Sequence, residues 1–230
     1  MDSVPLCTAF ERKLVHHCTP TFAALKPANL FSCPFEQPRS EQPQGEDGVS
    51  VGTCQESLTD ALRGARQKLD PHGVRIEILA RRATSSLIYV YRPNLLKQSI
   101  SQERVAAYLT QEGYDVSSLS SCITRLYQRI GGTDLKSQIT GTCSFPHEIG
   151  FFLGYPYEDV IGFIENRGEN FLCSGCWKVY AKERDAQTCF CCYKNCTVMY
   201  ESLFDEGVGI ECLAAVDENF PAAEAFLAAG

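Results

Sequence analysis

The sequence predicts an α+β fold, in which a small mixed, largely antiparallel sheet of about four strands is flanked by helices. Three observations support this fold class. Apolar residues recur at helical spacing in several windows, residues 74–79 alternate in polarity like a half-buried strand, and residues 87–91 are almost continuously apolar like a central strand. With 230 residues and no internal repeat, we expect a single domain over residues 1–230.

The first half of the chain predicts helices and a hairpin. Thr19 and Pro20 indicate a helix start, since threonine is a favoured N-cap and proline a favoured first helical residue. A second helix, with its apolar stripe between residues 58 and 69, ends at Pro71 and Gly73. Residues 74–79 and 87–91 then predict an outer and a central strand, joined as a hairpin.

The second half predicts more helices and two short strands. Two helices occupy the stretch up to Gly113 and residues 119–130. Two short helical stripes separated by residues 154–156 form a helix-turn-helix-like unit. Residues 176–180 alternate as a strand, residues 185–204 form the longest helix, and a last strand is expected near residues 208–213.

Two segments lack apolar periodicity. Residues 34–52 are rich in proline, glycine, glutamine and acid, which is the composition of a mobile surface loop, and residues 131–143 are similar in character. We therefore expect both segments to lie outside the packed core.

Net charge and cysteine content indicate the cellular compartment and the classes of partner to expect. The net charge is −7, from 21 basic and 28 acidic residues, which disfavours binding to a nucleic-acid backbone. The start of the chain does not resemble a signal peptide, no stretch is apolar enough to cross a membrane, and the 13 cysteines are odd in number. We predict a cytoplasmic protein with reduced thiols and no membrane partner.

Three segments resemble a known family. They are HHCTPTFAALKPANLF, LIYVYRP, and FPHEIGFFLGYPYEDVIGFIENRGENFLCSGCWKVY with KNCTVMY. Together they are similar to domain-of-unknown-function family 3793, whose members are intracellular proteins typical of Firmicutes. The resemblance covers most of the chain and implies a bacterial cytosolic protein of no established activity.

Cys18 and His147 are the main candidates for catalysis. A thiol at a helix N-terminus is favoured as thiolate, and His147 follows Pro146 at the predicted start of another helix. Folding could join them as in papain-like thiol hydrolases or acyltransferases, with Glu148 or Asn29 orienting the imidazole. The structural alternative is that Cys18 is a buried core residue and His147 a helix cap.

A thiolate metal site is a less favoured alternative. Zinc or an iron–sulfur cluster could be held by Cys173, Cys176, Cys192 and Cys196. However, the cysteines of the long helix fall on one wide apolar face, where they serve as small hydrophobes. We therefore favour the core interpretation and predict no cofactor.

The remaining interpretations concern partners. The helix-turn-helix-like unit offers Glu158 and Asp159 where DNA would require basic or amide side chains, so we expect no nucleic-acid partner. A non-catalytic binding or regulatory protein remains the alternative to the thiol enzyme. In that case the basic segment from Arg75 to Arg92 would engage an unknown acidic small molecule or protein.

Overall fold

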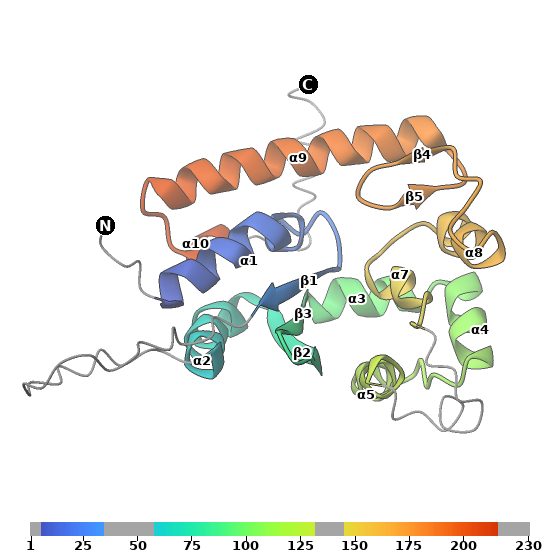
Figure 1. Cartoon of the computed structure of the whole chain (residues 1–230), viewed down its shortest axis with the longest axis horizontal. Helices are drawn as coiled ribbons and strands as arrows, with labels where there is room; N and C mark the ends of the chain where they lie inside the picture. The colour runs from blue at the N-terminus through green and yellow to red at the C-terminus, as the bar shows by residue number, and fades with distance from the viewer. Residues whose placement is uncertain (1–5, 35–57, 132–144, 216–230) are drawn as a thin grey trace, which may run out of the picture.

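The computed structural model describes residues 6–34, 58–131 and 145–215. The first part of the chain forms α1 (Leu6–Phe22), β1 (Ala28–Pro34), α2 (Leu58–Leu69), the 3₁₀ turn η1 (Asp70–His72), β2 (Arg75–Arg81) and β3 (Ser85–Tyr91). There follow α3 (Pro93–Ile100), α4 (Glu103–Gln111), α5 (Leu119–Ile130), α7 (Ile149–Phe152) and α8 (Tyr157–Glu165). The chain continues with β4 (Cys173–Ser174), β5 (Lys178–Val179), α9 (Glu183–Asp205) and α10 (Ile210–Leu213) (Figure 1). The α+β prediction is confirmed.

A three-stranded antiparallel sheet lies at the centre, in the order β1-β3-β2. Tyr91 of β3 pairs with Ala28 on one side and Arg75 on the other, so β3 is the central strand, as its apolar run predicts. A register shift between Ile78 and Ala80 interrupts the ladder on β2. A second sheet has two strands, β4 and β5, which form a short hairpin.

The sheet separates two apolar clusters. Alternate side chains of β3 point to opposite faces, so Ile88 and Val90 join one cluster while Leu87 and Tyr89 join the other. The first cluster is completed by α1, α2, α10 and the C-terminal half of α9, and the second by α3, α4, α5, α7 and α8. Figure 1 shows α9 running above both halves, from α10 at one end to β4 at the other.

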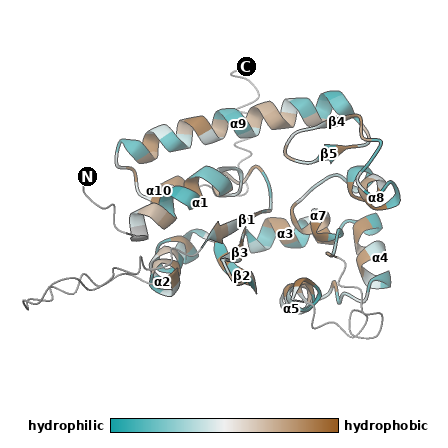
Figure 2. Cartoon of the chain, viewed as in Figure 1, coloured by the Kyte–Doolittle hydropathy of each residue, from teal (hydrophilic) through white to brown (hydrophobic). Residues whose placement is uncertain are grey.

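The helices covering these clusters are amphipathic. Figure 2 shows hydrophilic and hydrophobic stretches alternating along α9, α8 and α2. On α9 the inward side includes Cys192, Cys196 and Tyr200, all buried, whereas Cys191 is exposed. The thiols on the inner face of α9 therefore pack as small apolar groups, as the helical spacing predicts.

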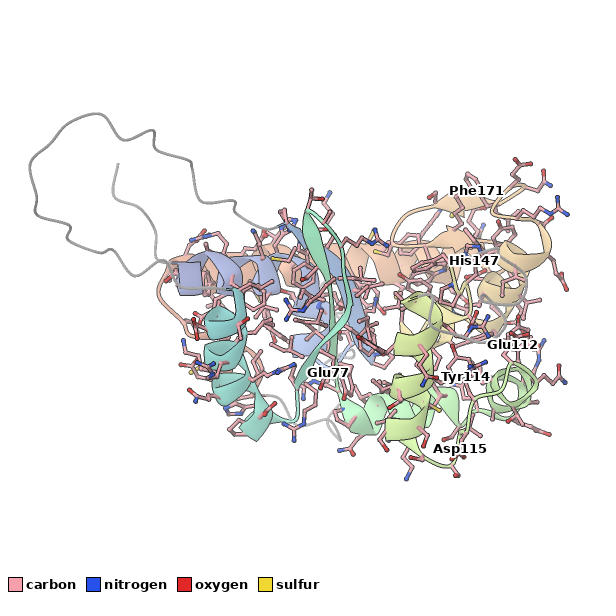
Figure 3. The ribbon with its side chains drawn as sticks, turned by 60° about the horizontal axis from the view of Figure 1, so that its bottom comes forward. Glu77, Glu112, Tyr114, Asp115, His147 and Phe171 are labelled. Atoms are coloured by element: carbon pink, nitrogen blue, oxygen red, sulfur yellow. The ribbon has the colours of Figure 1, made fainter. Side chains whose placement is uncertain are left out.

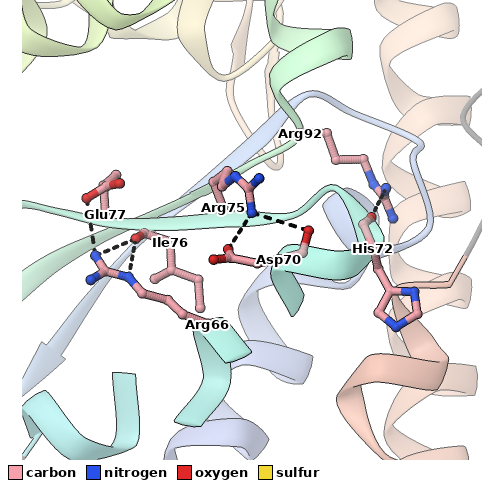
Figure 4. Close-up of polar contacts among 7 residues, drawn as sticks. All are labelled: Arg66, Asp70, His72, Arg75, Ile76, Glu77 and Arg92. Carbon is pink, nitrogen blue, oxygen red and sulfur yellow. Dashed lines mark hydrogen bonds and ion pairs between the residues drawn. The ribbon is translucent and has the colours of Figure 1, made fainter. Parts of the chain in front are cut away.

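Arg92 ties four segments together. It is fully buried and donates to the carbonyl oxygens of Thr21, Phe22, Ala214 and His72 over 2.7, 2.7, 2.8 and 3.0 Å. Carbonyl groups near helix ends carry partial negative charge, so they suit a buried guanidinium. Figure 4 shows the contact with His72.

Two further arginines, Arg66 and Arg75, also make contacts within the fold. Arg75 pairs with Asp70 at 2.7 Å, and Arg66 donates to the Ile76 carbonyl and to Glu77 (Figure 4). These contacts join α2 and η1 to the edge strand β2. Within the segment from Arg75 to Arg92, Arg75 and Arg92 are thus engaged by the fold, whereas Arg81 and Arg82 are exposed.

Two sequence expectations need correction. The helix expected to begin after Thr19 begins at Leu6 as α1, and continues through Pro20 to Phe22. The strand expected near residues 208–213 is instead the short helix α10, which buries Ile210 and Leu213. Strand β1 and helix α3 were not predicted. The expected loop at residues 34–52 falls, after Pro34 of β1, outside the described residues, as does most of 131–143.

Candidate functional site

Cys18 lies in the interior of α1 rather than at a helix start. The helix continues because the Thr19 hydroxyl bonds back to the Val15 carbonyl at 2.5 Å, while the Thr19 carbonyl accepts from the Ala23 N–H at 2.8 Å. The Cys18 side chain is completely buried, and this burial raises the pKa of its thiol. Neither solvent nor a helix N-terminus is available to activate it.

The residues expected to act with Cys18 have other partners. Asn29 accepts a hydrogen bond from Thr21 at 2.6 Å. Glu148 is buried, accepts from Tyr114 at 2.9 Å, and forms an ion pair with Arg129 at 2.9 Å. Both groups are thus held by structural contacts.

His147 is exposed and belongs to a different part of the molecule from Cys18. Cys18 packs in the cluster that covers one face of the central sheet, whereas His147 borders a pocket beside α8 and the β4–β5 hairpin. Figure 3 shows His147 and Phe171 near each other at one end of the molecule. Glu112 and Tyr114 are labelled at the same end, below His147 in this view. No described contact joins Cys18 with His147.

The pocket at His147 has a volume of about 310 Å³. Its walls come from the segment around α7, from α8 and from the β4–β5 hairpin. Rings make much of the lining, which includes Phe145, His147, Tyr155, Phe163 and Trp177. The His147 ring centroid lies 5.0 Å from that of Phe163, so the two rings form one side of the pocket. An aromatic lining of this kind suits an apolar, planar ligand.

Asp159 holds in place the wall of the pocket that the β4–β5 hairpin forms. This residue is in the first turn of α8 and is almost fully buried. One of its carboxylate oxygens accepts the backbone N–H groups of Tyr180 and Ala181 at 2.7 and 3.0 Å, and the other accepts the indole N–H of Trp177 at 2.7 Å. Because both oxygens are engaged, the carboxylate anchors the hairpin to α8.

The Trp177 indole lies between the pocket at His147 and a second hollow. Its indole stacks on Tyr155 with centroids 4.9 Å apart and meets Phe190 of α9 edge-on at 4.6 Å. A second hollow of about 310 Å³ lies beside it, bordered by Trp177 and Asp159 together with Cys189 and Tyr193 of α9. Trp177 thus forms a partition whose orientation is set by Asp159.

Lys178 supplies positive charge to the first pocket. Its ammonium group donates to the Gly168 carbonyl at 2.6 Å and lies 4.7 Å from the centroid of Phe171 and 5.8 Å from that of Phe163. An ammonium group has three N–H donors, so two are left for a ligand after the contact with Gly168.

A buried lysine, Lys26, also contacts the Tyr155 ring. The Lys26 ammonium is 5.1 Å from the centroid of Tyr155 and 5.9 Å from that of Tyr193. Burial lowers the pKa of Lys26 to about 8, and the opposing influence of Cys176 and Cys18 is smaller. The amine is therefore much closer to neutrality than an ordinary lysine.

The cysteines considered for metal binding are not gathered at one point. Cys173 and Cys176 are on the β4–β5 hairpin, whereas Cys192 and Cys196 are buried on α9. Cys189 also stands three positions before Cys192, which repeats the Cys-x-x-Cys spacing of the hairpin. Across residues 6–34, 58–131 and 145–215, no group of three or more histidine, cysteine or acidic side chains is arranged to hold a metal ion.

Sequence reasoning missed Asp159, Trp177, Lys178 and Lys26 as site residues. Trp177 is the chain's single tryptophan, and it lies between Cys176 of the Cys-x-x-Cys pair and Lys178. This combination could have marked the segment as a candidate binding site. Asp159 could be recognised only as a first-turn helix acid, since its three donors come from 18 to 22 residues downstream. In the same described part of the chain, no helix has the length and apolarity needed to cross a bilayer.

Comparison with known proteins identifies the family to which the chain belongs. Residues 14–214 match the family model described as "Protein of unknown function (DUF3793)". No curated protein matches the chain, and no solved structure matches it.

Proposed function

The chain belongs to the DUF3793 family, and for this member we propose that it is a binding protein for a small, planar aromatic ligand that carries an anionic group. The observation that carries the proposal is the ring-lined pocket between α8 and the β4–β5 hairpin. In this proposal the activity is recognition of the ligand, and the chain performs no bond-breaking chemistry at Cys18.

The shape of the pocket supports a planar ligand. His147 and Phe163 form one side and the Trp177 indole, stacked on Tyr155, forms another. Small-ligand sites are commonly apolar hollows of about 300–1,000 Å³ with a few polar groups, and this pocket falls at the small end of that range. A fused two-ring ligand matches that size better than a longer molecule.

The charges support an anionic group on that ligand. Lys178 has N–H donors left after its contact with Gly168, and His147 adds a further donor at the exposed side of the pocket. The Asp159 carboxylate has both oxygens occupied by donors from the protein, which reduces its repulsion of a bound anion. A carboxylate on the ligand can therefore bind Lys178 while the ring occupies the aromatic walls.

A papain-like hydrolase or acyltransferase is less well supported. That mechanism requires a thiolate that a substrate can reach and an imidazole within hydrogen-bond distance of it. The completely buried Cys18, with its raised pKa, offers neither condition. His147 keeps a role in the present proposal as a wall of the ligand pocket.

The test uses Trp177 as a built-in probe, because it is the chain's single tryptophan and lines the pocket. We expect 2-naphthoate to bind with saturable heat in calorimetry and to change Trp177 emission. Cyclohexanecarboxylate, which has the anion without a planar ring, and 2-methylnaphthalene, which has the ring without the anion, should each bind at least about tenfold more weakly. Equal affinity for all three compounds, or no saturable binding of 2-naphthoate, would refute the proposal.

A further inference from the structure

A third hollow lies between the edge strand β2 and helix α5. Its volume is about 530 Å³. Strand β2 and Tyr91 of β3 form one wall, and one side of α5 forms the other. The pocket proposed to hold an aromatic ligand shares no lining residue with this hollow. Whatever binds here is therefore recognised independently of the ring-lined pocket.

Tyr91 brings an unused hydroxyl group to this hollow. The residue is only 9% exposed, and it lies directly opposite Arg75 in the β2–β3 ladder, so both side chains are on the same face of the sheet. Among the described residues, the Tyr91 hydroxyl has no hydrogen-bond partner, and it is not one of the polar atoms sealed inside the fold. A tyrosine this deeply buried ordinarily has a partner for its O–H group. The hydroxyl is therefore available to a ligand in the hollow.

The wall formed by α5 has an apolar row beside a hydroxyl row. Leu119, Ile123 and Tyr127 recur at every fourth position, and Ser120 and Thr124 follow the same spacing next to them. Tyr127 is 51% exposed, and neither its hydroxyl nor that of Thr124 has a partner within the described ranges. This wall thus offers an apolar surface with an aromatic ring at its edge, next to groups that can form hydrogen bonds.

The charged residues of the lining are Arg75 and Glu77, two positions apart on β2. Arg75 pairs with Asp70, and Glu77 accepts a hydrogen bond from Arg66 through one of its two carboxylate oxygens (Figure 4). A guanidinium has five N–H donors and a carboxylate has two acceptor oxygens, so each side chain keeps hydrogen-bonding capacity for a ligand. Because the two charges are opposite, a ligand gains little by carrying a charge of its own. The lining favours a neutral ligand that both donates and accepts hydrogen bonds.

We propose that this hollow is a binding site for a neutral mono- or disaccharide. A sugar ring has an apolar C–H face, which can pack on Ile123 and the Tyr127 ring, and a rim of hydroxyl groups that each donate and accept hydrogen bonds. These hydroxyls match the Tyr91 O–H group, the donors of Arg75 and the open oxygen of Glu77. The volume lies within the range of about 300–1,000 Å³ that is common for small-ligand sites.

The first experiment needs no variant. The full chain is titrated in a calorimeter with the methyl glycosides of glucose, galactose, mannose and N-acetylglucosamine, with maltose, cellobiose and lactose, and with glucuronate and glucosamine as charged counterparts. We expect saturable binding at one site for at least one neutral sugar, and at least about fivefold weaker binding for both charged sugars. Absence of saturable binding across the whole panel, or tighter binding of a charged sugar, would overturn the proposal.

Two tyrosines of β3 provide a matched pair of variants that locates the site. Y91F should bind the sugar about threefold to tenfold more weakly, because one hydrogen bond is lost, and should keep the wild-type urea midpoint, because that hydroxyl has no partner in the described fold. In contrast, the Tyr89 hydroxyl donates to the Phe152 carbonyl at 2.8 Å and is outside the lining, so Y89F should lower the midpoint and keep the sugar affinity. Unchanged sugar affinity in Y91F would refute this site. Binding of 2-naphthoate should be the same in Y91F and wild type, so the two proposed sites succeed or fail separately.

Discussion

The Trp177 indole donates to the buried carboxylate of Asp159 over 2.7 Å, joining the β4–β5 hairpin to the first turn of α8. The same carboxylate receives two backbone N–H groups just after the hairpin. One side chain therefore determines the position of the wall between two hollows. Loss of the Asp159 carboxylate should therefore weaken ligand binding at the proposed pocket and also destabilise the hairpin.

The D159N variant should be less stable than the wild type and bind 2-naphthoate more weakly. An amide has one acceptor oxygen in place of two, so either Trp177 or the backbone donors lose a partner. A buried donor without a partner costs about 1–3 kcal/mol. Urea unfolding followed by circular dichroism, together with calorimetric titration, measures both effects.

The neighbouring substitution E158Q is a matched control for D159N. Glu158 occupies the same helical turn, but its partner Arg104 is exposed and the pair lies at the surface. Loss of such a pair should cost less than about 1 kcal/mol. Equal destabilisation by E158Q and D159N would show that Asp159 is not the special anchor described above.

The K178M variant should bind 2-naphthoate at least about tenfold more weakly, because it removes a charge-assisted hydrogen bond of about 1.5–3 kcal/mol. Its affinity for 2-methylnaphthalene should change little. The control is K194M, since Lys194 is an exposed lysine of α9 outside the pocket lining. Parallel weakening of both compounds by K178M would instead indicate collapse of the pocket.

Much of the fold could be predicted because its signals are local. The alternation at Ile76 and Ile78 and the apolar run of β3 are readable in the sequence, and both strands were found where expected. The start of α1 was missed because Thr19 and Pro20 form a standard helix-start pair, yet here the packing of the Phe10 to Phe22 face continues the helix through them.

The site was harder to predict because its members meet only in three dimensions. His147 was singled out in the sequence and lines the pocket, but its neighbours Phe163 and Trp177 come from α8 and from the hairpin. Lys26 was overlooked because a lysine is ordinarily a surface residue. Its burial depends on Tyr193, which is 167 positions away in the sequence.

Alkylation rates should distinguish the interior of α1 from the surface of α9. With iodoacetamide at neutral pH, Cys18 should react at least about 100-fold more slowly than Cys191, because it is completely buried and burial raises its pKa. Unfolding in urea should make the two rates similar. Rapid alkylation of Cys18 in the folded protein would revive the thiol-enzyme alternative. Quenched time points analysed by peptide mass spectrometry provide the rates.

Gly154 should be far less replaceable than Gly207. Both have positive φ, at +74° and +97°, so alanine is strained at either position. A Cβ at Gly154 would lie 2.4 Å from the Pro27 ring, whereas at Gly207 it meets nothing within 4 Å. We expect G154A to cost at least about 2 kcal/mol more than G207A in urea unfolding. Similar losses would mean that the turn before Tyr155 can move away from Pro27.

The pH dependence of the unfolding free energy should show whether the pKa of Lys26 is lowered in the folded protein. Its pKa is about 8 in the folded protein and near 10.5 when unfolded, so between these values the unfolded chain binds a proton that the folded chain does not. Wild-type stability should therefore gain about 3 kcal/mol from this group as the pH rises from 8 to 10.5, and lack this contribution below pH 8. In K26M the contribution is absent at every pH. Other groups titrate equally in both proteins, so the difference between their unfolding free energies isolates Lys26. If urea unfolding at pH 7 and pH 10.5 gives the same difference, the amine is not the desolvated group that its burial implies.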